Sequence, residues 1–427
     1  MGSAVIYRQE IIQDITLFTS EPKARFYSDL FAHLDLSGFP DNISATGRKG
    51  FSNHAKLRAA IVMKCECFSC ITDLLDYLQN NLLIAHYCGF NIMKPLPSYW
   101  TLDRFINGID NELLQNLMHF QVKKLYEAGI IDASFIALDS TPIMANTSHN
   151  NSKSFKKDKF KSDNQPKSDM DCGLGVHTAS NQHNEKKFEF YWGYKNHVLV
   201  DCITGLPIFE LTTTADVHDS SVALNILSQT NRFLPINDCT FIADKAYDVK
   251  EIYNTVKAVY NGDCAIPLNK RNTKNLEKLP SGHPLCEAGF AMNKDGKTYD
   301  NGRTRQKYCC PFKQSEISVC PCNHTNWNNG KKNKGCTKYV TLPDDYRLSI
   351  DRDCISFKKI YSLRTEIERY NSRFKQTGQD RLWVHGMNAA QNLNTIAHIS
   401  LLAVAYAAIV THSSCSYRSL KSVKRIA

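Results

Sequence analysis

The sequence lacks an apolar run long enough to cross a bilayer, and its first residues lack the charged, apolar and small-residue pattern of a signal peptide. The longest apolar run, 396–410, falls short of the roughly 20 residues that a spanning helix needs, and it contains His398. We therefore expect this run to form a buried core helix. We also expect a cytoplasmic protein without membrane attachment.

Acidic residues are outnumbered in the sequence. The 52 Lys and Arg residues against 42 Asp and Glu residues give a formal net charge of +10 and a pI near 8.8. Such a charge does not specify a fold, but it favours an anionic partner. With 427 residues, of which 42% are hydrophobic, the chain should form more than one domain with real cores.

Four residues near the C-terminal end stand at the spacing Tyr-x2-Arg-x3-Glu-x6-Lys: Tyr361, Arg364, Glu368 and Lys375. We expect 361–375 to be one helix. At about 100° per residue, the Arg, Glu and Lys fall on one stripe beside an apolar stripe. One carboxylate among cations suits an enzyme that places a metal-binding acid beside phosphate groups, because Arg and Lys neutralise phosphate oxygens.

Two further acids follow short apolar stretches. Asp139 ends an apolar run and precedes Pro142, which cannot donate to a sheet ladder and should end the strand. Asp244 follows the strand-like residues 240–243 and precedes a helical pattern at 249–260. Ligands of open α/β sheets bind at strand ends, so both acids are candidate site residues.

Asp139 in Leu-Asp-Ser-Thr, Asp244 in Ala-Asp-Lys-Ala-Tyr-Asp and Glu368 in the Tyr/Arg/Glu/Lys signature together resemble the acid triad of DDE transposases of bacterial insertion sequences. The resemblance covers roughly 56–407 and points to the insertion-sequence-four-like superfamily. It implies an α/β fold with an RNase H-like catalytic core, which is a mixed five-stranded sheet with flanking helices. An InsH-like helical N-terminal domain would precede this core.

The pattern of residues agrees with that order of elements. Aromatic and β-branched residues predict strands at 188–201 and 206–214, followed by a helix at 219–233 capped by Asp219 or Ser220. A fifth strand is expected at 264–269. The expected domains are 1–130, helical and recognising DNA ends; 131–270, the first part of the core, with a polar insertion at 146–187; 271–357, a Cys-rich insertion; 358–412, the C-terminal part of the core with the Glu helix; and 413–427, a basic tail.

The resemblance implies cleavage at the ends of a mobile element and transfer of the freed 3′ ends to target DNA. Two Mg²⁺ or Mn²⁺ ions would stabilise the attacking and leaving oxygens. Asp139 would bridge both ions, and Asp244 and Glu368 would each complete one. The implied partners are double-stranded DNA, as terminal inverted repeats and as target, and a second copy of the chain in a synaptic homodimer at the nucleoid.

Candidate DNA contacts are Tyr361, Arg364, Lys375, Lys195 and Lys245, although Lys245 is equally compatible with a solvated surface charge. Two alternatives remain open at this point. One is a metal-dependent nuclease or resolvase on the same fold. The other is a DNA-binding protein derived from a transposase that no longer catalyses.

The polar insertion 146–187 is rich in lysine and has few large apolar residues. Such a stretch cannot bury enough surface to order itself. It is therefore expected to be either disordered or an arm that binds DNA, in which case binding would depend strongly on salt.

The Cys-rich insertion could hold a tetrahedral Zn²⁺ ion, because four thiolates can stabilise a small lobe that lacks a core. The candidate ligands are Cys286, Cys310, Cys320, Cys322 and Cys336. Their spacing lacks the regular CxxC pairs of a zinc ribbon. Reduced, unbound thiols and oxidised pairs remain alternatives, although a disulfide framework is disfavoured in a cytosolic chain.

Overall fold

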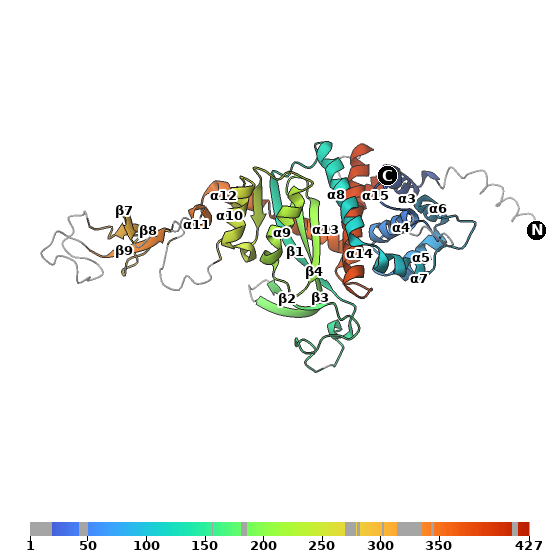
Figure 1. Cartoon of the computed structure of the whole chain (residues 1–427), viewed down its shortest axis with the longest axis horizontal. Helices are drawn as coiled ribbons and strands as arrows, with labels where there is room; N and C mark the ends of the chain where they lie inside the picture. Colours follow the sequence, from blue (N-terminus) through green and yellow to red (C-terminus); the bar gives the residue numbers. More distant parts are fainter. Residues whose placement is uncertain are drawn as a thin grey trace, which may run out of the picture. The chain divides into compact units, whose positions relative to one another are not determined.

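The computed structural model describes residues 19–41, 50–155, 157–180, 186–269, 279, 282–300, 303–313, 335–342, 346–411 and 417–426 (Figure 1). The chain divides into two compact units. Unit 1 comprises Met1–Phe241 and Leu363–Ala427, and unit 2 comprises Ile242–Ser362. Unit 1 therefore joins the N-terminal helices to most of the sheet, while unit 2 joins the end of the core to the Cys-rich insertion.

The N-terminal part of unit 1 is helical throughout its described elements, as predicted. Ser52 begins one helix by accepting a hydrogen bond from the Ala55 amide, and Asp110 begins another by accepting from the Glu112 amide. The helices are α3 (Pro22–His33), α4 (Asn53–Cys65), α5 (Ile71–Asn80), α6 (Leu82–Cys88), α7 (Tyr99–Gly108) and α8 (Asn111–Glu127).

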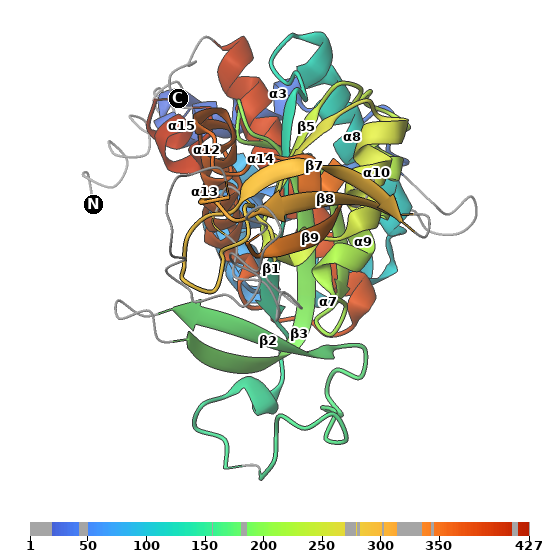
Figure 2. The same cartoon turned by 90° about the vertical axis from the view of Figure 1, so that its left-hand side faces the viewer.

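A six-stranded mixed sheet forms the core, which confirms the predicted α/β class but adds one strand to the expected five. Its strands run in the order β2-β3-β1-β5-β6, and β4 also pairs with β3. The long β3 pairs with β2 along its first half (Figure 2). It pairs with β4 along its second half. The strands are β1 (Phe135–Met144), β2 (Gly173–Ser180), β3 (Lys186–Asp201), β4 (Leu206–Thr214), β5 (Thr240–Ala243) and β6 (Asp263–Ala265).

The additional strand β2 lies inside the polar stretch 146–187, for which the sequence predicted no strand. The same stretch has a defined path over its described residues, which disfavours the disordered alternative there, while an arm that binds DNA stays a prediction. Low apolar content did not prevent order, because the stretch gains its contacts from β3 rather than from a core of its own.

β1 does not end at Pro142, as the sequence predicted, but continues to Met144. Pro142 stands opposite Lys195 in the antiparallel register with β3. A strand tolerates proline where the missing N–H has no ladder partner. Asp139, opposite Val198, therefore lies within the strand rather than at its exit.

The predicted single helix 361–375 is two helices, α12 (Ile355–Ser362) and α13 (Thr365–Phe374). The Ser362 hydroxyl donates to the Lys359 carbonyl at 2.6 Å, a local bond that competes with continuation of the helix. A wider turn, Lys375–Gln379, follows α13. It needs Gly378 at φ 85°, because a Cβ there would be strained and would lie 3.0 Å from the Phe68 carbonyl oxygen.

The central core helix is α14 (Met387–Val410). It confirms the predicted buried helix but begins nine residues earlier, because alanines and buried polar residues extend its packed surface. By length and composition this helix could cross a membrane, yet 83% of its most apolar window is buried inside the fold. It packs on α8, β4 and α4. The C-terminal α15 (Leu420–Ile426) packs on α3, and Lys424 pairs with Glu66 at 2.8 Å.

Unit 2 is organised by a buried carboxylate, Asp248. Arg347 holds the Asp248 carboxylate by two hydrogen bonds of 2.7 and 2.6 Å. Burial opposes ionisation of Asp248, but hydrogen bonds from Arg347, the Asn269 amide and Tyr253 outweigh it and lower the pKa. The helices of unit 2 are α10 (Lys250–Val259), α11 (Tyr346–Ser349) and α12, and its second sheet has the strands β7 (Asn293–Asp300), β8 (Arg303–Cys309) and β9 (Thr337–Leu342).

Candidate active site

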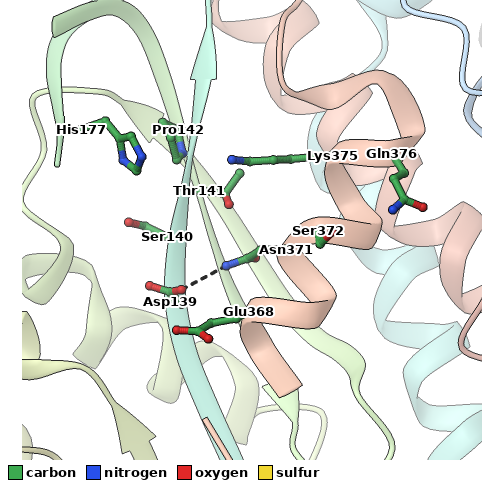
Figure 3. Close-up of a pocket in the computed structure, with 10 residues that line it drawn as sticks. All are labelled: Asp139, Ser140, Thr141, Pro142, His177, Glu368, Asn371, Ser372, Lys375 and Gln376. Carbon is green, nitrogen blue, oxygen red and sulfur yellow. Dashed lines mark hydrogen bonds between the residues drawn. The ribbon is translucent and has the colours of Figure 1, made fainter. Parts of the chain in front are cut away.

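A cavity of about 570 Å³ lies between β1 and α13 within unit 1 (Figure 3). It contains two of the three predicted acids, Asp139 from β1 and Glu368 from α13. The strand and the helix are remote in the sequence, so the fold alone brings these carboxylates together. The lining residues are Asp139, Ser140, Thr141, Pro142, His177, Glu368, Asn371, Ser372, Lys375 and Gln376.

Asp139 is held by Asn371, which lies one helical turn after Glu368. The Asn371 Nδ2 atom donates to Asp139 Oδ2 at 3.1 Å (Figure 3). The Asn371 side chain is buried, and its Oδ1 atom has no hydrogen-bond partner among the described residues. A buried amide oxygen without a partner is costly, so this atom is suited to accept from or coordinate a bound group.

Glu368 extends from α13 toward β1, close to Asp139 in the view of Figure 3. Its side chain is 53% exposed, and Arg364 Nη1 donates to its Oε1 atom at 2.6 Å. The arginine of the signature therefore neutralises the glutamate of the signature. A DNA contact by Arg364 stays a prediction.

Lys375 lines the same pocket and extends toward β1, where its ammonium group lies near Thr141 and Pro142 in the view of Figure 3. The sequence indicated Lys375 by its spacing from Glu368. It did not indicate His177, because that residue lies on the unexpected strand β2. It also did not assign Asn371 a role, although Asn371 shares the helical stripe of Glu368.

A buried chain of hydrogen bonds supports α13 from behind. The Tyr370 hydroxyl donates to His398 Nδ1 at 2.5 Å, and His398 Nε2 donates to Asn196 Oδ1 at 2.9 Å. Asn196 Nδ2 in turn donates to Glu210 Oε2 at 2.6 Å. Burial lowers the pKa of His398 to about 3 and raises the pKa of Glu210 to about 7. A neutral histidine with this tautomer satisfies both of its neighbours.

Lys195 and His197, which lie on β3, make internal contacts. The Lys195 ammonium donates to the Val217 carbonyl at 2.9 Å and to Asp219 at 3.0 Å. His197 is buried beside Thr213, and burial lowers its pKa to about 4. A DNA contact by Lys195 would have to break its existing bonds. This ion pair also explains why His218, rather than Asp219 or Ser220, caps α9 (Asp219–Asn231).

Three of the predicted catalytic and DNA-contact residues, Asp244, Lys245 and Tyr361, belong to unit 2. Asp244 accepts a hydrogen bond from the Ala246 amide at 2.7 Å and caps a short turn after β5. Lys245 is exposed, and the Tyr361 ring stacks on Phe357 with centroids 6.0 Å apart. That Asp244 joins Asp139 and Glu368 stays a prediction, as do DNA contacts by Lys245 and Tyr361.

The zinc prediction also stays open. Cys320 and Cys322 lie outside the described residues. The other three candidates, Cys286, Cys310 and Cys336, are buried together with a methionine and a tyrosine in the small core beside β8 and β9. Their packing is compatible with either inert thiols or part of a metal site.

The pocket offers the hard oxygen atoms that Mg²⁺ prefers. Over the described residues, no three His, Cys, Asp or Glu side chains form a group that could hold a metal ion. Mg²⁺, however, is usually held by one or two carboxylates together with substrate phosphates and waters. Asp139, Glu368 and the unpartnered amide oxygen of Asn371 fit that requirement.

Comparison with known proteins identifies a family for this chain. Residues 123–403, more than half of the chain, match the family model of the transposase DDE domain. Among solved structures, a piggyBac transposase synaptic complex with hairpin DNA is 11% identical, with a TM-score of 0.40, and the match covers 95% of this chain and 79% of that chain. A Mos1 transposase paired-end complex with the left transposon end is 12% identical, with a TM-score of 0.18 and coverage of 58% and 67%.

Both TM-scores are low, and comparison with curated proteins gives no match. The assignment therefore rests on the family model, whose span includes Asp139, Asp244 and Glu368. The chain belongs to the family of transposases with a DDE domain.

Proposed function

We propose that this DNA transposase cleaves phosphodiester bonds at the ends of a mobile element, an insertion sequence, and transfers the freed strands to target DNA. The observation that carries the proposal is the presence of Asp139 and Glu368 in one pocket with Lys375. Carboxylates for a cation, beside an ammonium group for a phosphate, are the groups that phosphodiester cleavage requires.

Each side chain of the pocket has a distinct part in this proposal. Asp139 and Glu368 hold divalent cations, and Asp244 is the third acid. Asn371 positions the Asp139 carboxylate by its 3.1 Å hydrogen bond. Lys375 binds a phosphate oxygen and positions the DNA strand over the acids.

Mg²⁺ or Mn²⁺ ions, two in number, would stabilise the attacking and leaving oxygens when bound. The DNA partners are the terminal inverted repeats and the target duplex. Holding two ends at once requires a second copy, so the active form is a homodimer. We place the protein in the cytoplasm, at the nucleoid, where its substrate lies.

The test incubates the purified chain with Mg²⁺ and duplex DNA from the borders of its own element. Asp139→Asn, Asp244→Asn and Glu368→Gln should each abolish nicking, whereas the exposed control Glu127→Gln should nick normally. Joining of the cut strand to a second duplex identifies a transposase, and nicking without joining identifies a nuclease. Binding of the border DNA without any nicking would identify a non-catalytic DNA-binding protein.

A further inference from the structure

The stretch between β1 and β2 forms a loop that is anchored to the sheet at its base. We call residues 151–167 the lysine loop. Asn150, just before it, donates to the Ala145 and Trp192 carbonyls at 2.9 and 2.8 Å and accepts from the Trp192 amide at 2.9 Å. The Trp192 indole N–H donates to the Lys159 carbonyl at 2.7 Å. These bonds fix the middle of the loop against β3.

The far end of the loop is anchored as well. Gln165 Nε2 donates to the Met170 and Cys172 carbonyls at 2.6 and 3.1 Å. The buried Tyr194 hydroxyl donates to Asp169 at 2.7 Å, immediately beyond the loop. A loop held at both ends presents its outer side chains on a defined surface, which lowers the entropy cost of binding a partner.

That surface is cationic. The lysines Lys153, Lys157, Lys161 and Lys167 are exposed. Only Lys161 makes an ion pair among the described residues of the loop, with Asp158 at 3.2 Å. The positive charges of the loop therefore outnumber its negative charges, and the whole chain has a formal net charge of +10. A polyanion such as the DNA backbone complements this surface.

Phe155 stands fully exposed between Lys153 and Lys157. A single exposed apolar side chain is ordinary on a protein surface. Here, however, the ring is flanked by cations on an anchored loop, which is the combination that lets a protein contact phosphates and insert an apolar wedge between base steps. Phe155 is therefore placed to contact bases while the lysines contact the backbone.

The loop has no arginine for reading base edges, and its Asn and Gln side chains are engaged with the backbone. Arginine forks and Asn or Gln amides are the main readers of base sequence. The stretch 146–187 contains no arginine. Asn151, Asn164 and Gln165 are bonded to the backbone of the loop or of the residues that follow it. The lysines of the loop are therefore suited mainly to phosphate contacts, which position DNA without reading its sequence.

We propose that the lysine loop is the surface that binds target DNA, with lysines on phosphates and Phe155 against the bases. This inference rests on the proposed function, because only a strand-transferring enzyme has a target. Element ends must be recognised by sequence, whereas a target can be bound without it. The loop connects β1, which carries Asp139, to β2, which carries His177, so it belongs to the same two strands as the pocket residues.

The first test measures binding of a random-sequence duplex at several salt concentrations. The variant Lys153→Gln/Lys157→Gln/Lys167→Gln should reduce the slope of log affinity against log salt by about 0.9 for each lost contact, roughly 3 in all. Phe155→Ala should weaken binding about tenfold. The matched control Lys123→Gln/Lys250→Gln/Lys421→Gln replaces exposed lysines outside the loop. It should change the salt slope and the affinity for the duplex less than the loop variants do. An unchanged slope in the loop variant, or an equal change in the control, overturns the proposal.

The second test separates this proposal from the proposed function. The loop variants should retain nicking of border DNA and lose strand joining. Loss of nicking to the same degree as joining would overturn the assignment to target DNA, since the loop would then serve the element ends. If the unaltered chain does not nick border DNA, the proposed function fails, while the binding experiment still decides whether the lysine loop is a DNA-binding surface.

Discussion

Asn371 donates a hydrogen bond to Asp139 at 3.1 Å, and this bond joins the helix of one candidate acid to the strand of the other. It leaves the amide oxygen of Asn371 buried and without a hydrogen-bond partner in the described part of the chain. The bond makes Asn371 a positioning residue for the site. The rotamer of Asp139 therefore depends on Asn371, which is not one of the three acids.

Asn371→Ala should raise the Mg²⁺ concentration needed for half-maximal nicking by about 10- to 100-fold, the range for residues that orient metal ligands. The thermal midpoint should change little compared with this effect. The measurement is a Mg²⁺ titration of nicking beside thermal unfolding. Ser372→Ala, at the next exposed position of the pocket, is the control. An unchanged Mg²⁺ requirement in Asn371→Ala would contradict the positioning role.

The two arginine–carboxylate pairs should differ in their contribution to stability. Arg347→Ala leaves the buried Asp248 carboxylate without its bidentate partner and should cost about 3 kcal/mol of the free energy of unfolding. Arg364→Ala removes the ion pair with Glu368, four residues later on the surface, and should lower the free energy of unfolding by at most about 0.5 kcal/mol. Denaturant unfolding of both variants measures the difference. Equal losses of the free energy of unfolding would contradict a larger contribution from the buried Asp248 pair.

Glu210 should make stability fall as pH rises. Burial raises its folded-state pKa from 4.5 to about 7, so its contribution is fully present below pH 4.5 and is lost as pH rises through about 7. Glu210→Gln should remove this dependence, whereas the exposed control Glu127→Gln should keep it. The free energy of unfolding measured between pH 4.5 and 7 decides the point. Parallel pH profiles for the unaltered chain and Glu210→Gln would refute it.

Zinc in the Cys-rich insertion predicts about one Zn²⁺ ion per chain after purification without added metal. Cys310→Ser and Cys336→Ser should each lose it, while Cys239→Ser, a buried cysteine outside the insertion, should retain it. Elemental analysis of the purified variants measures the ion. Metal-free protein with all cysteines reduced would instead support inert thiols.

Local patterns predicted much of the fold. The strand Leu206–Thr214 was placed at both ends, because aromatic and β-branched residues mark it in the sequence. The burial of α14 followed from an apolar run, and the fold class followed from the resemblance to DDE transposases. The strand β2 was not predicted, because it is stabilised by pairing with β3 rather than by its own composition.

The candidate site divides in the same way. Spacing indicated Glu368 and Lys375, and an apolar run indicated Asp139. The break between α12 and α13 depends on a local hydroxyl bond of Ser362, and the pairing of Asp248 with Arg347 joins residues far apart in the chain. Neither the Ser362 hydrogen bond nor the Asp248–Arg347 pair produces a periodic pattern in the sequence. Asp244 lies outside unit 1, so its convergence with the other acids remains a prediction from the signature.

The central claim is that Asp139, Asp244 and Glu368 hold the same divalent cations, and Mn²⁺ binding measured by electron paramagnetic resonance tests it most directly. Asp139→Asn, Asp244→Asn and Glu368→Gln should each weaken Mn²⁺ binding at least about tenfold, while Glu127→Gln should bind like the unaltered chain. Unchanged Mn²⁺ affinity in Asp244→Asn, with the other two variants impaired, would contradict a site shared by all three acids.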